Sequence, residues 1–339
     1  MADTGSSGDA PRGTAWAPAA AAVAGAALGI ALLSAVFPRI PNDMERTRTI
    51  LDALRGGRGR PADIVVFGSS ICMSGIDAGL LSADLGDGRT AWNLSSTGQS
   101  LYEALMLTAR LPDRSRTVVL GVSSNALAMD RVEVVANKIV AYRMYGWEPT
   151  ARLLELVREI GDPELRREIE RSRLSARLDA RWIVKAGIDT AIRRLVRKDL
   201  GFETAMTDLL YPQPYSRPVA PEALEKQISA HHGRRESFRV SPAVVKALDA
   251  IARLTSEGGR KLILVVLPEH PKVRALSTGE WERERVEAIA DLERRGGFDV
   301  VDAHGLLGAQ HFIDHVHLTA GGAEILTRVL ASHLAGPPR

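Results

Sequence analysis

The segment Asp63-Ile64-Val65-Val66-Phe67-Gly68-Ser69-Ser70 decides the fold class of this chain. Its apolar run is rich in β-branched side chains and small residues follow it, which is typical of a strand buried on both faces. Similar short runs recur at Thr90–Leu94, Thr117–Leu120, Leu262–Leu267 and Phe298–Val301. Amphipathic stretches with helical spacing separate the runs. This alternation predicts an α/β fold: a doubly wound, parallel, five-stranded sheet with helices on both faces.

Residues that favour the start of a helix support the same α/β prediction, and one long segment interrupts the alternation of strands and helices. Ser241 precedes a proline at the expected first position of a helix, and Thr319 is placed to cap the last helix. The segment 131–241 shows no clear strand and separates the third apolar run from the fourth. We expect this segment to be a helical insertion, which either covers a site as a lid or only packs against the sheet.

Composition and charge exclude several classes of protein. Hydrophobic residues make up 45% of the 339 residues and charged residues 25%, which is ordinary for a globular chain and excludes global disorder. Lysine and arginine exceed aspartate and glutamate by only three, so no basic field suited to nucleic acid is expected. The single cysteine, Cys72, excludes an internal disulfide and a cysteine-based metal site.

An uncharged segment near the beginning of the chain predicts a membrane anchor. No charged residue lies between Arg12 and Arg39, and the central apolar run would span roughly 28 Å as a helix, close to the thickness of a bilayer core. A buried helix would need a polar stripe, and a signal peptide has a shorter apolar region. The chain is thus predicted to begin with a tail at residues 1–18, a transmembrane helix at 19–38 and a juxtamembrane helix with linker at 39–61. An α/β domain follows in two pieces, 62–130 and 242–336, with the insertion at 131–241 between them.

The orientation of this anchor is ambiguous in the sequence. Arg12 is the only basic residue before the apolar run, whereas six arginines follow it by residue 60. The positive-inside rule would therefore place the main domain in the cytoplasm, although long domains can be translocated despite local charge.

Small polar residues, glycines and a histidine follow the predicted strands. They lie at Gly68–Ser70, Ser95–Gly98, Ser123–Asn125, Glu269–His270 and Asp314–His317. In open α/β sheets ligands bind beyond the carboxyl ends of the strands, so these residues should share one edge. A hydroxyl, amide donors, an imidazole and a carboxylate together suit acyl transfer.

The same residues resemble the SGNH (GDSL-like) hydrolase and acyltransferase superfamily, and most closely its membrane-anchored bacterial branch that modifies cell-surface polymers. The resemblance covers residues 63–130 and 261–334 and leaves out the insertion. Its most specific part is the closing block, in which Asp314 and His317-Leu318 are followed by Gly321-Gly322. The resemblance implies an acyl-serine intermediate and no cofactor.

Site roles follow from the resemblance residue by residue. Ser70 matches the nucleophile, His317 the base and Asp314 the carboxylate that orients the base, which is the logic of a serine triad. Ser70 and Gly98 match the backbone donors to the oxyanion. The family's third conserved block, which follows the third predicted strand, departs from the pattern in this chain. Ser123 stands where asparagine is usual, and Asn125 lies two residues further on, so the role of Asn125 as a donor stays uncertain.

Other readings of these residues remain open. Ser70 could cap a helix or bind a phosphate, and Cys72 is better explained as a small buried residue than as a second nucleophile. Glu269 and His270 are candidates for substrate contacts or a solvated turn. A zinc site of Asp314, His317 and two neighbouring histidines is disfavoured, because the loop lacks the helix that makes i, i+4 spacing a chelate; no metal is expected.

Two classes of function are consistent with the sequence. The first is a membrane-anchored serine esterase or O-acyltransferase that acts on small acyl esters of cell-envelope glycans, with its catalytic domain outside the cytoplasm. The second is a non-catalytic anchored module that partners a membrane-bound O-acyltransferase, which the altered third block motivates. A cytosolic nucleotide binder is disfavoured, because no glycine-rich phosphate-binding motif is present.

Overall fold

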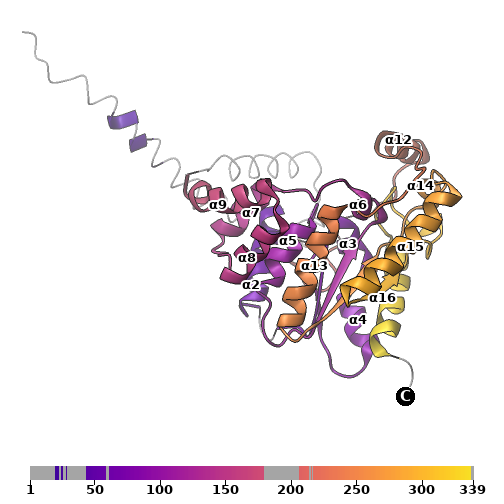
Figure 1. Ribbon diagram of the computed structural model, residues 1–339, viewed down its shortest axis with the longest axis horizontal. Coiled ribbons are helices and arrows are strands. Elements are labelled where there is room, and N and C mark those ends of the chain that lie inside the picture. Colours follow the sequence, from indigo (N-terminus) through magenta and orange to yellow (C-terminus); the bar gives the residue numbers. More distant parts are fainter. Residues whose placement is uncertain are drawn as a thin grey trace, which may run out of the picture.

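A computed structural model describes residues 43–58, 61–178, 206–213, 215 and 217–336, together with residues 20–22, 24, 25 and 28. Five parallel strands form one sheet of order β2-β1-β3-β4-β5 (Figure 1). The strands are β1 Ile64–Gly68, β2 Ala91–Asn93, β3 Thr117–Val122, β4 Lys261–Val266 and β5 Asp299–Asp302. This order reverses direction at β1, as in doubly wound sheets of the flavodoxin type, so the predicted α/β fold is confirmed.

Helices cover both faces of the sheet. The α-helices are α2 Asp43–Leu54, α3 Ser70–Gly75, α4 Ala78–Leu85, α5 Leu101–Thr108, α6 Ser124–Ala128, α7 Ala136–Met144, α8 Ala151–Ile160, α9 Pro163–Leu178, α12 Pro221–His231, α13 Pro242–Glu257, α14 Pro271–Arg274, α15 Gly279–Gly296 and α16 Ala320–Ala335, and a 3₁₀ turn spans Ala309–His311.

Alternate residues of each strand face two different apolar cores. Val65 and Phe67 of β1 pack in a core with α5, α13 and α15. Ile64 and Val66 point to the opposite face, into a core with α4 and α16. Because both faces of the sheet are buried, the strands appear in the sequence as continuous apolar runs without alternation.

Strand and helix boundaries agree with the sequence expectations to within two residues. The side chain of Ser241 accepts a hydrogen bond from Val244 at the beginning of α13, and Thr319 caps α16 in the same way. Strand β5 begins at Asp299, one residue later than expected. Gly297, with φ of 63°, ends helix α15 in a left-handed conformation just before Phe298, and this turn delays the strand.

The described part of the segment between β3 and β4 contains the helices α7, α8, α9 and α12 and no strand, as expected. Helices α7, α8 and α9 group beside α2, α5 and α13 (Figure 1), and their apolar residues join the core of that face. The proline-rich residues described between 211 and 220 form neither helix nor strand. They contact the loop after β5 instead, through bonds from Val219 N–H to the Ile313 carbonyl, 2.9 Å, and from Gln213 Nε2 to the Leu318 carbonyl, 3.0 Å.

The predicted membrane segment, residues 19–38, lies almost entirely outside the described residues. Within the described ranges, no helix is both long enough and apolar enough to cross a membrane. Helix α2 follows this segment and matches the helix expected within residues 39–61.

Candidate active site

Ser70, Asp314 and His317 lie together at the carboxyl edge of the sheet. The Oγ atom of Ser70 is 3.0 Å from Nε2 of His317, although the two residues are 247 positions apart in the chain. On the other side of the ring, Nδ1 of His317 is 2.7 Å from Oδ2 of Asp314. The structure therefore forms a hydroxyl–imidazole–carboxylate chain from the three residues expected to make a triad.

The direction of the hydrogen bonds in this chain follows from the chemistry of its ends. A carboxylate only accepts, so the Nδ1 that faces Asp314 carries the proton of the neutral imidazole. Nε2 then has a free lone pair and accepts the hydroxyl hydrogen of Ser70. This tautomer is the one that a general base requires.

The backbone around Asp314 holds its carboxylate in place. Oδ1 accepts hydrogen bonds from the N–H groups of Val316 and His317, both at 2.8 Å. Burial raises the pKa of Asp314, but the hydrogen bonds from His317 and the two backbone donors outweigh burial and lower this pKa to about 2. The side chain is therefore a carboxylate throughout the neutral range.

Replacing Asp314 with asparagine is expected to destabilise the fold in a pH-dependent way. Since the folded chain lowers the pKa of this group from 3.8 to about 2, its contribution is present above pH 3.8 and is lost as the pH falls towards 2. We expect Asp314→Asn to cost about 1–2 kcal/mol at pH 7, since solvent partly screens the site. Urea unfolding at pH 7, 4 and 3 should show the difference from wild type shrinking; a difference that is independent of pH would contradict the assignment.

Two facing glycines explain how Ser70 reaches the edge of the sheet. Gly68 at the end of β1 has φ of 157°, and a Cβ there would lie 2.5 Å from the Cβ of Cys72 and 2.7 Å from the Gly121 carbonyl oxygen. A Cβ on Gly121 would lie 2.5 Å from the Cys72 sulfur. The two glycines thus make room for α3 to turn directly over the sheet, with Ser70 as its first residue.

Cys72 fills this space as a packing residue. Its side chain is fully buried, and burial raises the pKa of the thiol to about 12. A thiol with this pKa is protonated at neutral pH, so Cys72 is not a competing nucleophile.

Further hydrogen bonds tie α3 to the two loops beside it. The Oγ of Ser74 accepts a bond from Leu318 N–H at 3.3 Å, which joins α3 to the residue after His317. The buried amide of Asn93 donates to the carbonyl oxygens of Cys72 and Ile76, at 3.2 and 2.7 Å. These bonds fix Ser70, at the start of α3, relative to both His317 and the end of β2.

The turn that carries Gly98 lies beside the start of α3. The N–H of Ser96 donates to the Gly68 carbonyl at 3.0 Å, and the side chain of Gln99 accepts from Gly68 N–H at 2.7 Å. Gly98 is exposed, has φ of 59°, and its N–H makes no hydrogen bond within the described part of the chain. A Cβ at this position would meet nothing within 4 Å, so no other atom crowds this side of Gly98.

Asn125, the uncertain third donor, lies in α6 and has other partners. Its Nδ2 is 3.3 Å from Nδ1 of His232, and its Oδ1 accepts a bond from Arg235 at 3.0 Å. Both partners come from the insertion, more than 100 residues away. No hydrogen bond within the described ranges joins Asn125 to Ser70 or His317.

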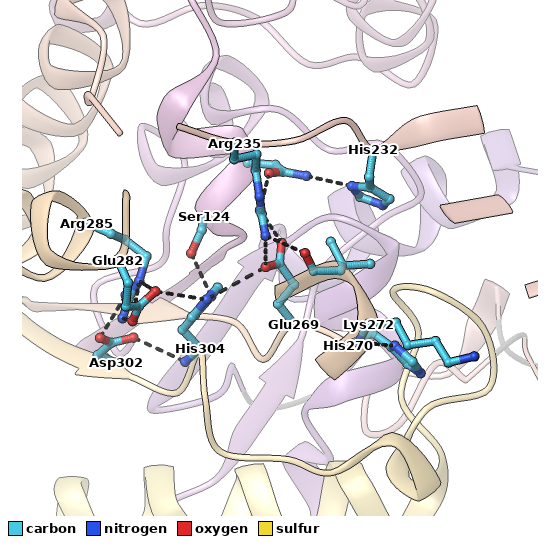
Figure 2. A network of polar contacts seen from close by, with 12 residues as sticks. Ser124, His232, Arg235, Glu269, His270, Lys272, Glu282, Arg285, Asp302 and His304 are labelled. Carbon is cyan, nitrogen blue, oxygen red and sulfur yellow. Dashed lines mark hydrogen bonds and ion pairs between the residues drawn. The ribbon is translucent and has the colours of Figure 1, made fainter. Parts of the chain in front are cut away.

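Glu269 and His270 belong to a polar network that Figure 2 shows. Glu269 makes a two-oxygen ion pair with Arg235, at 2.9 and 2.6 Å, and both side chains are about nine-tenths buried. His270 is buried and caps α14, with Nδ1 accepting from Lys272 N–H at 3.1 Å. Across the described residues, neither side chain bonds to the triad, so the structure assigns both of them partners within the protein.

Two other features of this region were not predicted from sequence. Tyr215 stacks on the His317 ring with centroids 3.7 Å apart and an interplanar angle of 25°. His304, which follows β5, is buried and is 3.0 Å from the Oγ of Ser124 (Figure 2). Tyr215 lies in the proline-rich segment, where no periodicity indicates which side chain turns inward.

Histidines also gather beside the triad. The rings of His231 and His232, at the end of α12, lie 5.4 and 5.2 Å from that of His315. Burial is the main cause that lowers the pKa of His232 and of His315, and at His315 the neighbouring carboxylate of Asp314 opposes it. Within the described residues, no group of three or more histidine, cysteine, aspartate or glutamate side chains is arranged to hold a metal ion.

The fold class and the geometry of the site can be compared with those of known proteins. The five-stranded parallel sheet is compatible with SGNH-like and flavodoxin-like folds. At its carboxyl edge, Ser70, His317 and Asp314 form one hydrogen-bonded chain. No protein-family model matches the chain, and a search of curated proteins found no match. The α/β fold class is therefore established, and the family and activity are matters for proposal.

Proposed function

We propose that this protein is a serine esterase or O-acyltransferase of the SGNH type, with Ser70 as nucleophile, His317 as base and Asp314 as the group that orients the base. The observation that carries the proposal is the 3.0 Å separation between Ser70 Oγ and His317 Nε2, with the Asp314 carboxylate on the opposite ring nitrogen. Nucleophile, base and orienting group within hydrogen-bond reach are the signature of an activated serine.

In the first half of the proposed reaction, Ser70 Oγ attacks the carbonyl carbon of an acyl ester and its proton moves to His317 Nε2. Asp314 stabilises the imidazolium that forms and keeps its Nδ1 proton in place. The tetrahedral intermediate then collapses, the ester C–O bond breaks, and the alcohol leaves with the proton from His317. The product of this half-reaction is an acyl-serine.

The oxyanion of the intermediate needs donors that are free before the reaction. The N–H of Gly98 has no hydrogen-bond partner among the described residues, and the N–H of Ser70 is at the first position of α3, where no carbonyl of that helix can accept it. These two donors would stabilise the oxyanion. Such stabilisation is often the largest contribution to the catalysis of acyl transfer.

In the second half of the proposed reaction, a hydroxyl group attacks the acyl-serine and takes the acyl group from Ser70, with His317 again as base. Water as acceptor gives hydrolysis, and a sugar hydroxyl gives O-acylation. We propose small, acetyl-like acyl groups and a cell-envelope glycan, with the apolar run of residues 19–38 holding the domain at the outer side of a membrane. Support for this substrate and location comes from the sequence resemblance and the uncharged segment.

The function can be tested with an activated acetyl ester offered to the full-length chain in detergent, with and without a deacetylated cell-wall polysaccharide. We expect release of the leaving alcohol by the wild type and none above background by Ser70→Ala. Acetate alone would indicate an esterase, and O-acetyl sugar found by mass spectrometry would indicate a transferase. Equal rates for the two proteins would remove Ser70 from the mechanism.

A non-catalytic module that partners a membrane-bound O-acyltransferase is the second candidate. One observation favours it: the amide of Asn125, the candidate for the third donor that an SGNH-type site usually has, is engaged by His232 and Arg235. The loss of one such donor lowers rates by about 10²–10³ in other enzymes. A folded chain that has no esterase activity and that a covalent serine-hydrolase probe fails to label would support this candidate.

A further inference from the structure

A partly buried lysine of the insertion is bonded to the turn that carries Gly98. Lys138, on α7, donates through its Nζ to the carbonyl oxygen of Thr97 and to Ser96 Oγ, the latter at 3.2 Å. Its side chain is 17% exposed. An ammonium group that is largely shielded from solvent needs acceptors within the protein, and two of those it has belong to the turn.

The third acceptor is Glu103, which holds the ammonium group in place. Glu103, on α5, is 1% exposed and lies 3.4 Å from Lys138 Nζ. Its carboxylate also accepts bonds from Ser100 N–H, 2.9 Å, and Tyr142 Oη, 3.1 Å. With this many fixed partners, the carboxylate cannot follow the lysine if the turn moves, so the Lys138 Nζ is anchored relative to α5.

The carbonyl of Thr97 and the N–H of Gly98 are the two ends of one peptide group. A peptide group is planar, so a bond that fixes the oxygen also fixes the direction in which the N–H points. A positive charge on the carbonyl oxygen draws electron density from the nitrogen, and hydrogen bonds in series strengthen one another in this way. The contact therefore both orients the free Gly98 N–H and makes it a stronger donor.

We propose that Lys138 is a positioning residue of the active site, which acts through the Thr97–Gly98 peptide group on the oxyanion donor. This inference rests on the proposed function. It gives the insertion a part in catalysis beyond packing, because α7 supplies the cation. The competing explanation is that Lys138 only neutralises the buried charge of Glu103.

The test compares three variants of the full-length chain with wild type in the acetyl ester assay. Lys138→Met removes the charge at similar length, and Glu103→Gln/Lys138→Met removes both charges so that no buried carboxylate is left unpaired. Lys246→Met is the matched control, since Lys246 makes the same kind of bond, to the Ile160 carbonyl at 3.0 Å, between α13 and α8. Kinetic constants, the Ki of phenylboronic acid and thermal unfolding are measured for each.

We expect both Lys138 variants to lower kcat by about tenfold with KM changed less than about twofold, because only the oxyanion of the transition state depends on the peptide group. The Ki of the boronic acid, whose serine adduct carries a similar oxygen, should rise by the same factor. Lys246→Met should match wild type in all three constants.

Recovery of wild-type kcat in the double variant would overturn the inference, because it would leave Lys138 with the role of neutralising Glu103 alone. So would an unchanged boronic acid Ki in a double variant that unfolds at the wild-type temperature. If instead Ser70→Ala retains wild-type activity, the proposed function itself fails, whatever the Lys138 variants do.

Discussion

Replacing Ser70 or His317 with alanine is expected to lower kcat for an activated acetyl ester by about 10⁴-fold or more, since each change removes a partner of the same proton transfer. Ser70→Ala takes away the atom that forms the acyl bond. His317→Ala leaves the hydroxyl with no base, because Nε2 is the acceptor 3.0 Å from it. The two groups act as a unit, so the double variant should be no slower than either single one. Steady-state rates of leaving-group release measure all three.

The chain contains a matched control for each substitution. Ser69 precedes Ser70 and caps α3 without a side-chain hydrogen bond, so Ser69→Ala removes a neighbouring hydroxyl and nothing from the triad. His333 forms a second histidine–aspartate pair, with Asp299 at 3.2 Å, so His333→Ala removes an imidazole that does not belong to the triad. Both control variants should retain wild-type rates. Comparable losses in Ser69→Ala and Ser70→Ala would contradict the assignment of the nucleophile.

Replacing Arg46 with methionine is expected to produce the largest loss of stability, about 3–5 kcal/mol in the free energy of unfolding. Arg46 is 1% exposed. From α2 it donates to the carbonyl oxygens of Ser95, Asn93 and Asp208, at 2.8, 2.5 and 2.5 Å. Burial lowers the pKa of Arg46 to about 10, so the group is still charged at pH 7. Methionine would leave these carbonyl oxygens without their donor.

Urea unfolding of the Arg46 variant measures this effect, and Arg48 supplies the control. Arg48 lies on the same helix, but its side chain is 45% exposed and its carboxylate partners are 3.7 Å or more away. Arg48→Met should therefore change stability by less than about 0.5 kcal/mol. Equal, small losses in the two variants would show that the buried bonds of Arg46 contribute little. A fall in kcat is also expected for Arg46→Met, because Ser95 begins the turn that carries Gly98.

The layout of the sheet was predictable because its physical causes are local. Strands buried on both faces must be apolar at every position, so β1, β3 and β4 stand out as uninterrupted runs. Helix starts were predictable for the same reason, since the caps at Ser241 and Thr319 involve only residues within three positions. The short edge strand β2 was expected to be longer than it is, because a sequence run does not show where pairing with one neighbour ends.

The three residues of the triad could be brought together by topology alone. Ser70 follows β1 and His317 follows β5, and in a parallel sheet the residues after each strand share one edge. Asp314 and His317 are three residues apart, so their contact is local. Sequence spacing could not give the 3.0 Å contact itself, which depends on Gly68, Gly121 and Cys72 packing against one another.

The supporting residues were not predictable, because their contacts are distant in sequence and have no periodicity. Lys138 and Arg46 reach the turn between β2 and α5 from 41 and 49 residues away. Tyr215 meets His317 from a segment without regular structure. Asn125 looked available as a donor from its position after β3, but its partners His232 and Arg235 come from the insertion, whose path no motif indicated.

The most direct measurement of the central claim is peptide mapping after reaction of the full-length chain with a fluorophosphonate, which reacts only with an activated hydroxyl. We expect a single phosphonyl group on Ser70, formed rapidly by wild type and by Ser69→Ala but not by His317→Ala. A folded wild-type chain that carries the group on another residue would contradict the assignment of the triad. So would a His317→Ala variant whose Ser70 is labelled as rapidly as in wild type.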